Sequence, residues 1–139
     1  MKNSTLPVTK RIAAMATVLL ILCCTGLHAQ PGQNKKVKKV FYGQASYYAQ
    51  KFQGRKTANG EIFSHQKMTA ACNAVPLGTW VRVTNLRNGK SVIVKVNDRL
   101  HKGMRRITDL TLTAAKKLGF VKAGVTRVKV EILEKGKYG

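Results

Sequence analysis

The chain has only five acidic side chains in 139 residues, so candidates for general acid or base chemistry can be sorted by position. Glu131 alternates with apolar neighbours, which predicts a solvent-facing side chain, and Glu134 lies near the C-terminus. Glu61, Asp98 and Asp109 each lie at a predicted strand end or loop, where folds commonly present functional residues. These three carboxylates are the candidates for chemistry.

Each of the three also has a structural interpretation. Asp98 follows the predicted strand 91–96 and precedes Arg99, so a turn with a surface ion pair would explain it. Asp109 precedes a predicted helix, where capping or turn formation would explain it. Glu61 follows an Asn-Gly turn that could aim a carboxylate into a cleft. Local pattern leaves both kinds of role open for all three.

The sequence offers no metal or cofactor site. His65, Cys72 and His101 do not have the spacing of metal ligands, and we expect neither metal nor cofactor. Cys72 and His101 could form a nucleophilic pair only if the fold brings them together, since no local signature supports one. A lone cysteine after two alanines is more typical of a packed side chain.

Residues 1–29 have the pattern of a secretory signal peptide. Lys2, Lys10 and Arg11 precede an apolar run from residue 12 to 24, and a cleavage point follows Ala29. The run is shorter than the roughly 20 residues of a membrane-spanning helix, so a retained anchor is the second interpretation. We therefore predict export to the periplasm or cell envelope, with no stable membrane span after cleavage.

Cysteine positions bear on anchoring and on disulfides. Cys23 and Cys24 lack the small preceding residue of a lipoprotein signal, which argues against a lipid anchor. Cleavage would leave Cys72 alone, so no intrachain disulfide is expected and packing must stabilise the fold.

The charge balance indicates a polyanionic partner. The net charge is +21, and without the three basic residues of the leader 23 Lys and Arg face 5 Asp and Glu, a net charge of +18. Export argues against nucleic acid and favours cell-wall polymer or anionic lipid; a merely solubilising surface is the plain alternative. Residues 30–40 hold a lysine cluster and little apolar content, which predicts a flexible basic arm.

From about residue 41 the pattern is short apolar alternations separated by turn residues, typical of an all-β sandwich or barrel. Candidate strands cover 42–48, 80–84, 91–96 and 128–132. Asn88-Gly89 predicts a hairpin between the second and third of these. A helix over 113–118 would be capped by Thr111 or Thr113 and ended by Gly119. We predict a mainly β fold, a small closed barrel with one short helix, over residues 41–133, followed by a frayed tail at 134–139.

Several ordered motifs resemble the rare-lipoprotein-A domain, a six-stranded double-psi β-barrel. They are the segments 43–48 (GQASYY), 52–61 (FQGRKTANGE), 69–71 (TAA), 76–79 (PLGT), 81–85 (VRVTN), 97–99 (NDR) and 107–111 (ITDLT) with Ala114-Ala115. Together they cover about residues 41–133, and their order makes the resemblance far more specific than any one motif.

The resemblance implies lytic transglycosylation of peptidoglycan glycan strands, in some members strands without stem peptides at the division septum. By position, Asp98 would be the catalytic acid/base and Glu61 a second catalytic residue. The residues that would support the cleft are Asp109, Cys72, Arg99 and His101. One carboxyl group can protonate the leaving oxygen and then accept the proton of the sugar's 6-hydroxyl as an anhydro ring closes. Peptidoglycan, with division-site proteins, would be the partner.

The sequence departs from the family pattern at two places. Cys72 stands where many members have histidine, and a thiol is not a cationic hydrogen-bond donor near neutral pH. The family's Asp-Arg-Gly-Pro reads Asp98-Arg99-Leu100-His101 here, so His101 could restore the imidazole or be an exposed loop residue.

Two other classes of function stay open at this stage. A catalytically silent, expansin-like wall-binding module of the same fold is the main alternative, and Cys72 is its best argument. An exported nucleic-acid or lipid-binding protein would rest on charge alone.

Overall fold

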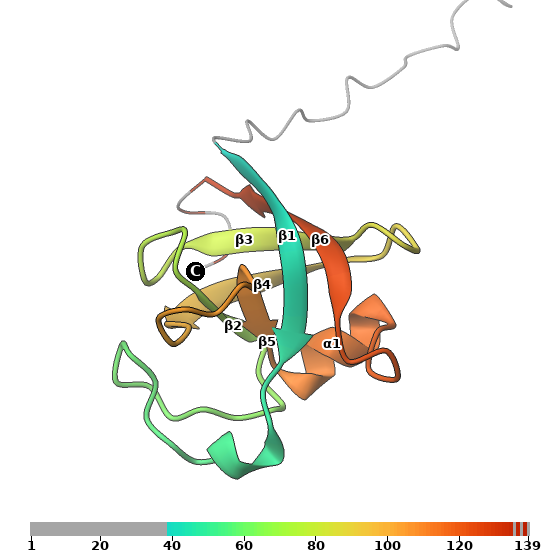
Figure 1. Cartoon of the computed structure of the whole chain (residues 1–139). Coiled ribbons are helices and arrows are strands. Elements are labelled where there is room, and N and C mark those ends of the chain that lie inside the picture. The colour runs from blue at the N-terminus through green and yellow to red at the C-terminus, as the bar shows by residue number, and fades with distance from the viewer. Residues whose placement is uncertain (1–38, 135, 137, 139) are drawn as a thin grey trace, which may run out of the picture. The chain divides into compact units, whose positions relative to one another are not determined.

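The computed structural model describes residues 39–134, 136 and 138. Six strands form one closed barrel in the spatial order β1-β5-β2-β4-β3-β6 (Figure 1). The strands are β1 (Val40–Tyr47), β2 (Thr69–Cys72), β3 (Trp80–Asn85), β4 (Ser91–Asp98), β5 (Thr108–Leu110) and β6 (Thr126–Ile132). A 3-10 turn, η1 (Gln50–Phe52), and one helix, α1 (Leu112–Leu118), complete the elements. The predicted mainly β barrel with a single short helix is confirmed.

Closure of the barrel leaves none of these six strands with an unpaired edge. The β1–β5 and β2–β4 pairs are parallel and the other four pairs are antiparallel. Alternate residues of the long strands point inward, because successive side chains of a strand face opposite sides. On β4 these are Val92, Val94 and Val96, which pack in the central core with Val81 and Val83 of β3. The parallel pairs place two short strands that are distant in sequence beside longer ones: β5 lies beside the end of β1, and β2 lies beside the end of β4.

The helix forms close to its predicted range, beginning at Leu112 instead of residue 113. Thr111 is the N-cap and its side chain accepts a hydrogen bond from Ala114 N at 3.4 Å. Gly119 ends the helix with φ of 74°, a left-handed conformation that glycine adopts without strain. Its buried face, Ala114, Ala115 and Leu118, packs into the barrel core.

Several boundaries differ from the sequence predictions. The first strand begins at Val40, inside the predicted basic arm, and β4 continues through Asp98 instead of ending at residue 96. Glu131 does not face solvent freely, because its side chain is only 12% exposed and pairs with Lys129 at 3.2 Å and Arg82 at 4.0 Å. The hairpin of β3 and β4 is confirmed, with Gly89 at a φ of 75°.

The predicted signal peptide, 1–29, and the arm residues 30–38 lie outside the described residues, as do positions 135, 137 and 139 of the predicted tail. Within the tail, the ring of Tyr138 lies 6.2 Å from that of Trp80. In the part of the chain that is described, no helix has the length and apolar content needed to cross a membrane.

Candidate active site

Asp98 is the last residue of β4, at the end of the barrel from which the connection between β1 and β2 also leaves (Figure 1). Strands β2 and β4 change register here: Ala70 pairs with Val96, but Ala71 pairs with Asp98. Asn97 is therefore an extra residue in β4. Such a bulge re-aims the side chains next to it.

Three donors hold the Asp98 carboxylate. Its Oδ1 accepts hydrogen bonds from Ala58 N at 2.9 Å and from Arg99 N at 2.8 Å. Its Oδ2 accepts one from the Tyr48 hydroxyl at 2.7 Å. The carboxylate is thus fixed to its own strand end, to the 57–61 loop and to the residue that follows β1.

Tyr48 is held as firmly as the carboxylate that it contacts. Its backbone N donates to Leu110 O at 3.0 Å, and its ring lies 4.3 Å from the ring of Phe63 and 5.7 Å from that of Phe52. Burial, followed by the hydrogen bond to Asp98, raises the pKa of the Tyr48 phenol far above its ordinary value. The hydroxyl therefore stays protonated and acts as a donor.

Asp98 opens onto a groove of about 610 Å³. Both aromatic and basic side chains line it, and it is large enough for part of a glycan chain. Its lining residues are Tyr47, Tyr48, Ala49, Phe52, Arg55, Lys56, Ala71, Asp98, Arg99, Leu100, His101, Met104, Arg106 and Asp109. Five of these side chains are basic or imidazole groups and two are carboxylates, so the groove favours anionic or neutral polar ligands.

Asp109, on β5, also lines the groove but is paired. Arg106 Nε donates to its Oδ1 at 2.8 Å and Arg106 Nη2 to its Oδ2 at 3.1 Å, a two-point contact. The same hydrogen bonds raise the pKa of the Arg106 guanidinium. Asp109 does not cap the helix, because Thr111 does. Its geometry is that of a residue that supports the groove wall.

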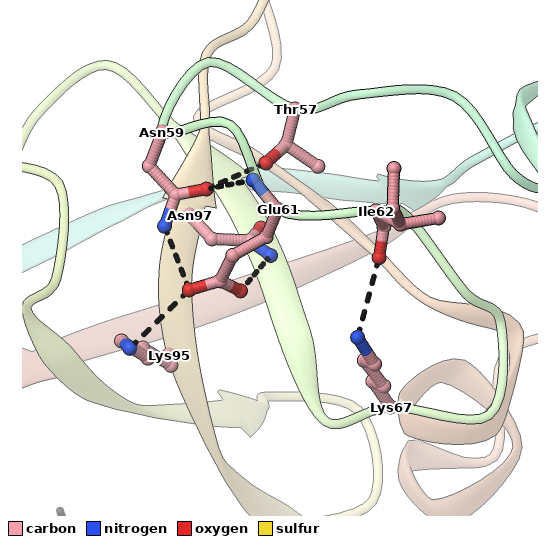
Figure 2. A network of polar contacts seen from close by, with 7 residues as sticks. All are labelled: Thr57, Asn59, Glu61, Ile62, Lys67, Lys95 and Asn97. Carbon is pink, nitrogen blue, oxygen red and sulfur yellow. Dashed lines mark hydrogen bonds and ion pairs between the residues drawn. The ribbon is translucent and has the colours of Figure 1, made fainter.

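Glu61 belongs to a different polar network (Figure 2). Its carboxylate accepts from Asn59 Nδ2 at 2.8 Å, Asn97 Nδ2 at 3.1 Å and Lys95 Nζ at 3.4 Å. The hydrogen bonds from Asn97 and Asn59 lower the pKa of Glu61. Glu61 is not among the residues that line the groove of Asp98.

The Glu61 network nevertheless reaches Asp98 through the backbone. Asn59 Oδ1 accepts from Thr57 Oγ1 at 2.7 Å and from Glu61 N at 3.1 Å, which closes the 57–61 loop on itself. Asn59 N donates to Asn97 O at 3.2 Å, and the adjacent Ala58 N donates to Asp98. Glu61 thus helps to fix the loop that holds one oxygen of Asp98.

Cys72 lies inside the barrel core. Its side chain is buried, 1% exposed, and burial raises the pKa of the thiol. It does not line the groove, although its neighbour Ala71 does. Arg99 Nη1 donates to the carbonyl oxygens of Cys72 and Val75, so the arginine clamps the β2–β3 connection beside the groove.

The two histidines in the described part of the chain do not converge on one site. His101 is exposed on the groove rim, and its Nδ1 lies 2.8 Å from Lys102 O. His65 is buried, and its Nδ1 accepts from Leu112 N at 3.1 Å. The described residues include no cluster of three His, Cys, Asp or Glu able to hold a metal ion.

The structure therefore brings together Asp98, Asp109, Arg99 and His101 at one groove and places Glu61 and Cys72 elsewhere. Sequence reasoning missed Tyr48 and Arg106. Tyr48 lies within the GQASYY motif, but a tyrosine at the end of an apolar strand is indistinguishable by pattern from a packing residue. The Arg106 pairing has a weak signal in its spacing of three from Asp109.

Solved structures share this fold. A Streptomyces papain inhibitor aligns with a TM-score of 0.57 at 23% identity, covering 71% of this chain and 98% of that one. A Clavibacter michiganensis expansin aligns with a TM-score of 0.54 at 25% identity, covering 70% of this chain and 52% of that one. The closed barrel with two parallel pairs, together with these neighbours, defines a double-psi β-barrel protein.

A family model described as lytic transglycolase matches residues 40–130, and the chain belongs to this family. The endolytic peptidoglycan transglycosylase RlpA of Pseudomonas aeruginosa is 56% identical over 89 residues, 64% of this chain and 26% of that protein. The protein of the same name from Vibrio cholerae is 48% identical over 93 residues, 66% of this chain and 35% of that protein. The chain thus spans about a quarter to a third of the length of these relatives.

Proposed function

We propose that the protein is an endolytic lytic transglycosylase that cleaves the glycan strands of peptidoglycan. The observation that carries the proposal is Asp98, a carboxylate fixed by three donors at the wall of a groove of about 610 Å³, in a barrel of the lytic transglycolase family. The names of the curated relatives give the substrate class.

In the proposed reaction Asp98 serves first as acid and then as base. Its proton passes to the glycosidic oxygen as the C1–O bond breaks, and the sugar's own 6-hydroxyl oxygen bonds to C1. The 6-hydroxyl proton returns to Asp98, so the carboxyl group is regenerated and a 1,6-anhydro product is released. No water is consumed, so a second carboxylate at hydrolase spacing is unnecessary. This agrees with the pairing of Asp109 by Arg106.

The groove's positive charges suit the wall polymer. Among residues 39–134 neither Arg55 nor Lys56 takes part in an ion pair, and both line the groove. Stem peptides and lactyl groups of peptidoglycan carry carboxylates, which these cations would attract. We further propose that the preferred strands lack stem peptides. We also propose that the protein acts at septation and that division-site proteins are its partners. Action on the wall requires export to the cell envelope.

A catalytically silent wall-binding module is the second candidate. It is favoured by the structural likeness to an expansin and by Cys72, which puts a buried thiol where many family members have histidine. In that case the same groove would bind glycan without cleavage.

The deciding experiment incubates the purified protein and its Asp98→Asn variant with intact and amidase-stripped sacculi, with mass spectrometry of the soluble products. Anhydro-muramyl products from the wild type, lost in the variant, are the expected result. Binding to sacculi without soluble product from either substrate would contradict the enzyme and favour the binding module.

A further inference from the structure

The two oxygens of Asp98 are not equivalent. A carboxylate oxygen has two lone pairs, and both on Oδ1 are used by backbone donors, Ala58 N and Arg99 N. From the described residues Oδ2 accepts only the hydrogen bond of the Tyr48 hydroxyl, at 2.7 Å, which leaves one lone pair for a proton. A proton that moves between Asp98 and a ligand in the groove must therefore occupy Oδ2.

The donor to Oδ2 is built to keep a fixed position. The Tyr48 ring packs against the rings of both Phe52 and Phe63, and Phe63 is only 2% exposed. Phe63 in turn packs against His65, with 4.8 Å between the ring centroids, and the Tyr48 backbone is bonded to β5. The hydroxyl is thus anchored through its ring and its backbone.

The phenol also keeps its own proton. Burial and the neighbouring Asp98 carboxylate both disfavour the phenolate, so Tyr48 donates but does not ionise. It is consequently unsuited to serve as the acid itself. Tyr48 must therefore affect the reaction through Asp98.

We propose that Tyr48 is a positioning residue for the transglycosylase reaction: its hydroxyl orients Asp98 so that Oδ2 is the oxygen that gives and receives the proton. The inference rests on the proposed function and adds to it the atom that transfers the proton and the side chain that aims it. The proton leaves Oδ2 for the glycosidic oxygen and the 6-hydroxyl proton returns to Oδ2, while the Tyr48 proton is not consumed.

Tyr48→Phe tests the inference, because it removes the hydroxyl and keeps the ring that packs against Phe52 and Phe63. We expect the rate of anhydro-product release to fall about 10- to 100-fold, the effect of losing one hydrogen bond to a charged group. A lost donor to the carboxylate favours its protonated form, so the high-pH limb of the rate profile should move to higher pH. A merely structural role would lower the rate equally at every pH.

Tyr42→Phe is the matched control. Tyr42 lies on β1 with 63% of its surface exposed, outside the groove, and its hydroxyl loss should leave rate and pH profile unchanged. Thermal unfolding of all variants identifies any rate loss that comes from a destabilised fold.

An NMR measurement detects the hydrogen bond from Tyr48 to Asp98 independently of enzymatic activity. A buried phenol that donates to a carboxylate should give a downfield hydroxyl-proton resonance, lost in Tyr48→Phe and moved upfield in Asp98→Asn. Wild-type rate and pH profile in Tyr48→Phe, or no such resonance in the wild type, would overturn the inference alone. A wild-type chain that releases no anhydro product would instead overturn the proposed function, and with it the positioning role of Tyr48 in that reaction.

Discussion

Asn97 and Asp98 are consecutive residues at the end of β4, yet their side chains belong to separate polar networks. Asn97 is 1% exposed and donates from Nδ2 to Glu61, whereas Asp98 lines the groove and accepts from Tyr48. The bulge between β2 and β4 shifts the alternation of β4 by one residue, so Asn97 is buried like Val96 before it, and Asp98 faces the other side. Glu61 and Asp98, the two residues to which the family resemblance gives catalytic roles, thus have different surroundings and different expected roles.

The Glu61 network makes a pH prediction. Hydrogen bonds from Asn97 and Asn59 lower the pKa of Glu61 in the folded protein below its ordinary value of 4.5. Stability from this group is therefore fully present above about pH 4.5 and is lost as the pH falls through the lowered folded-state pKa. The free energy of unfolding, measured with urea at pH 7, 4.5 and 3, should show this loss.

Glu61→Gln is the matched variant for that measurement. An amide cannot titrate, so the difference in stability between wild type and variant should shrink as the pH falls from 4.5 to 3. A difference that stays constant over this range would show that Glu61 is not held as a carboxylate by its neighbours. If Glu61 acts through the 57–61 loop, the variant should also lower the reaction rate less than Asp98→Asn does.

Much of the barrel was predictable because its long strands carry their own pattern. The alternation of β3 and β4, the Asn-Gly turn and the Thr111 and Gly119 caps are local features, and each formed as predicted. Strands β2 and β5 have only four and three residues, which is too short for an alternating pattern to mark them in the sequence. In the sequence, their residues are marked only as parts of motifs that resemble the family.

The site was predictable in its residue types but not in its pairings. Which carboxylate lines the groove depends on the bulge in β4 and on Ala58, Tyr48 and Arg106, contacts 3 to 50 positions away in sequence. The roles of Asp98, Asp109, Arg99 and His101 in the groove stay predictions until variants are assayed.

The Arg106–Asp109 pair should be energetically coupled. Both side chains are partly buried and their contact is two-pointed, so a double-mutant cycle with Arg106→Ala and Asp109→Ala should give a coupling energy of about 1 kcal/mol. The measurement is urea unfolding of the wild type, both single variants and the double variant. Strictly additive losses would contradict a role for the pair in supporting the groove wall.

Cys72 should behave as a core residue and not as a nucleophile. Its thiol is 1% exposed and its pKa is raised by burial, so brief treatment with iodoacetamide should leave the Cys72 peptide unmodified in the native protein and alkylated in urea. Cys72→Ala should keep the reaction rate and lose about 1–2 kcal/mol of stability. Rapid native alkylation together with loss of activity would restore the nucleophilic pair as an explanation.

Cys72→His asks whether the family's histidine can be accommodated. A larger, polar ring at a fully packed position should destabilise the fold by about 1–3 kcal/mol more than alanine does. Comparison of the two variants by thermal unfolding checks this. A stable histidine variant with a higher reaction rate would instead mean that the barrel can open position 72 to the groove.

The absence of a side chain at Gly43 leaves room for Ile107 beside β1. A Cβ at Gly43 would lie 2.5 Å from Ile107 Cγ2, closer than side chains can approach, so Gly43→Ala must displace Ile107. Ile107 N donates to Gln44 O at 2.9 Å, and the displacement should therefore move the backbone beside Arg106. We expect a loss of about 1–3 kcal/mol in urea unfolding, as for other overpacked sites.

The reciprocal change should relieve that loss. Ile107→Ala alone removes buried apolar contacts and destabilises the fold, but in combination with Gly43→Ala it removes the atom that clashes. The double variant should therefore be more stable than the sum of the two single losses predicts. Additive losses would show that the strain is absorbed elsewhere in β1, and the position of Arg106 in the groove would then not depend on this contact.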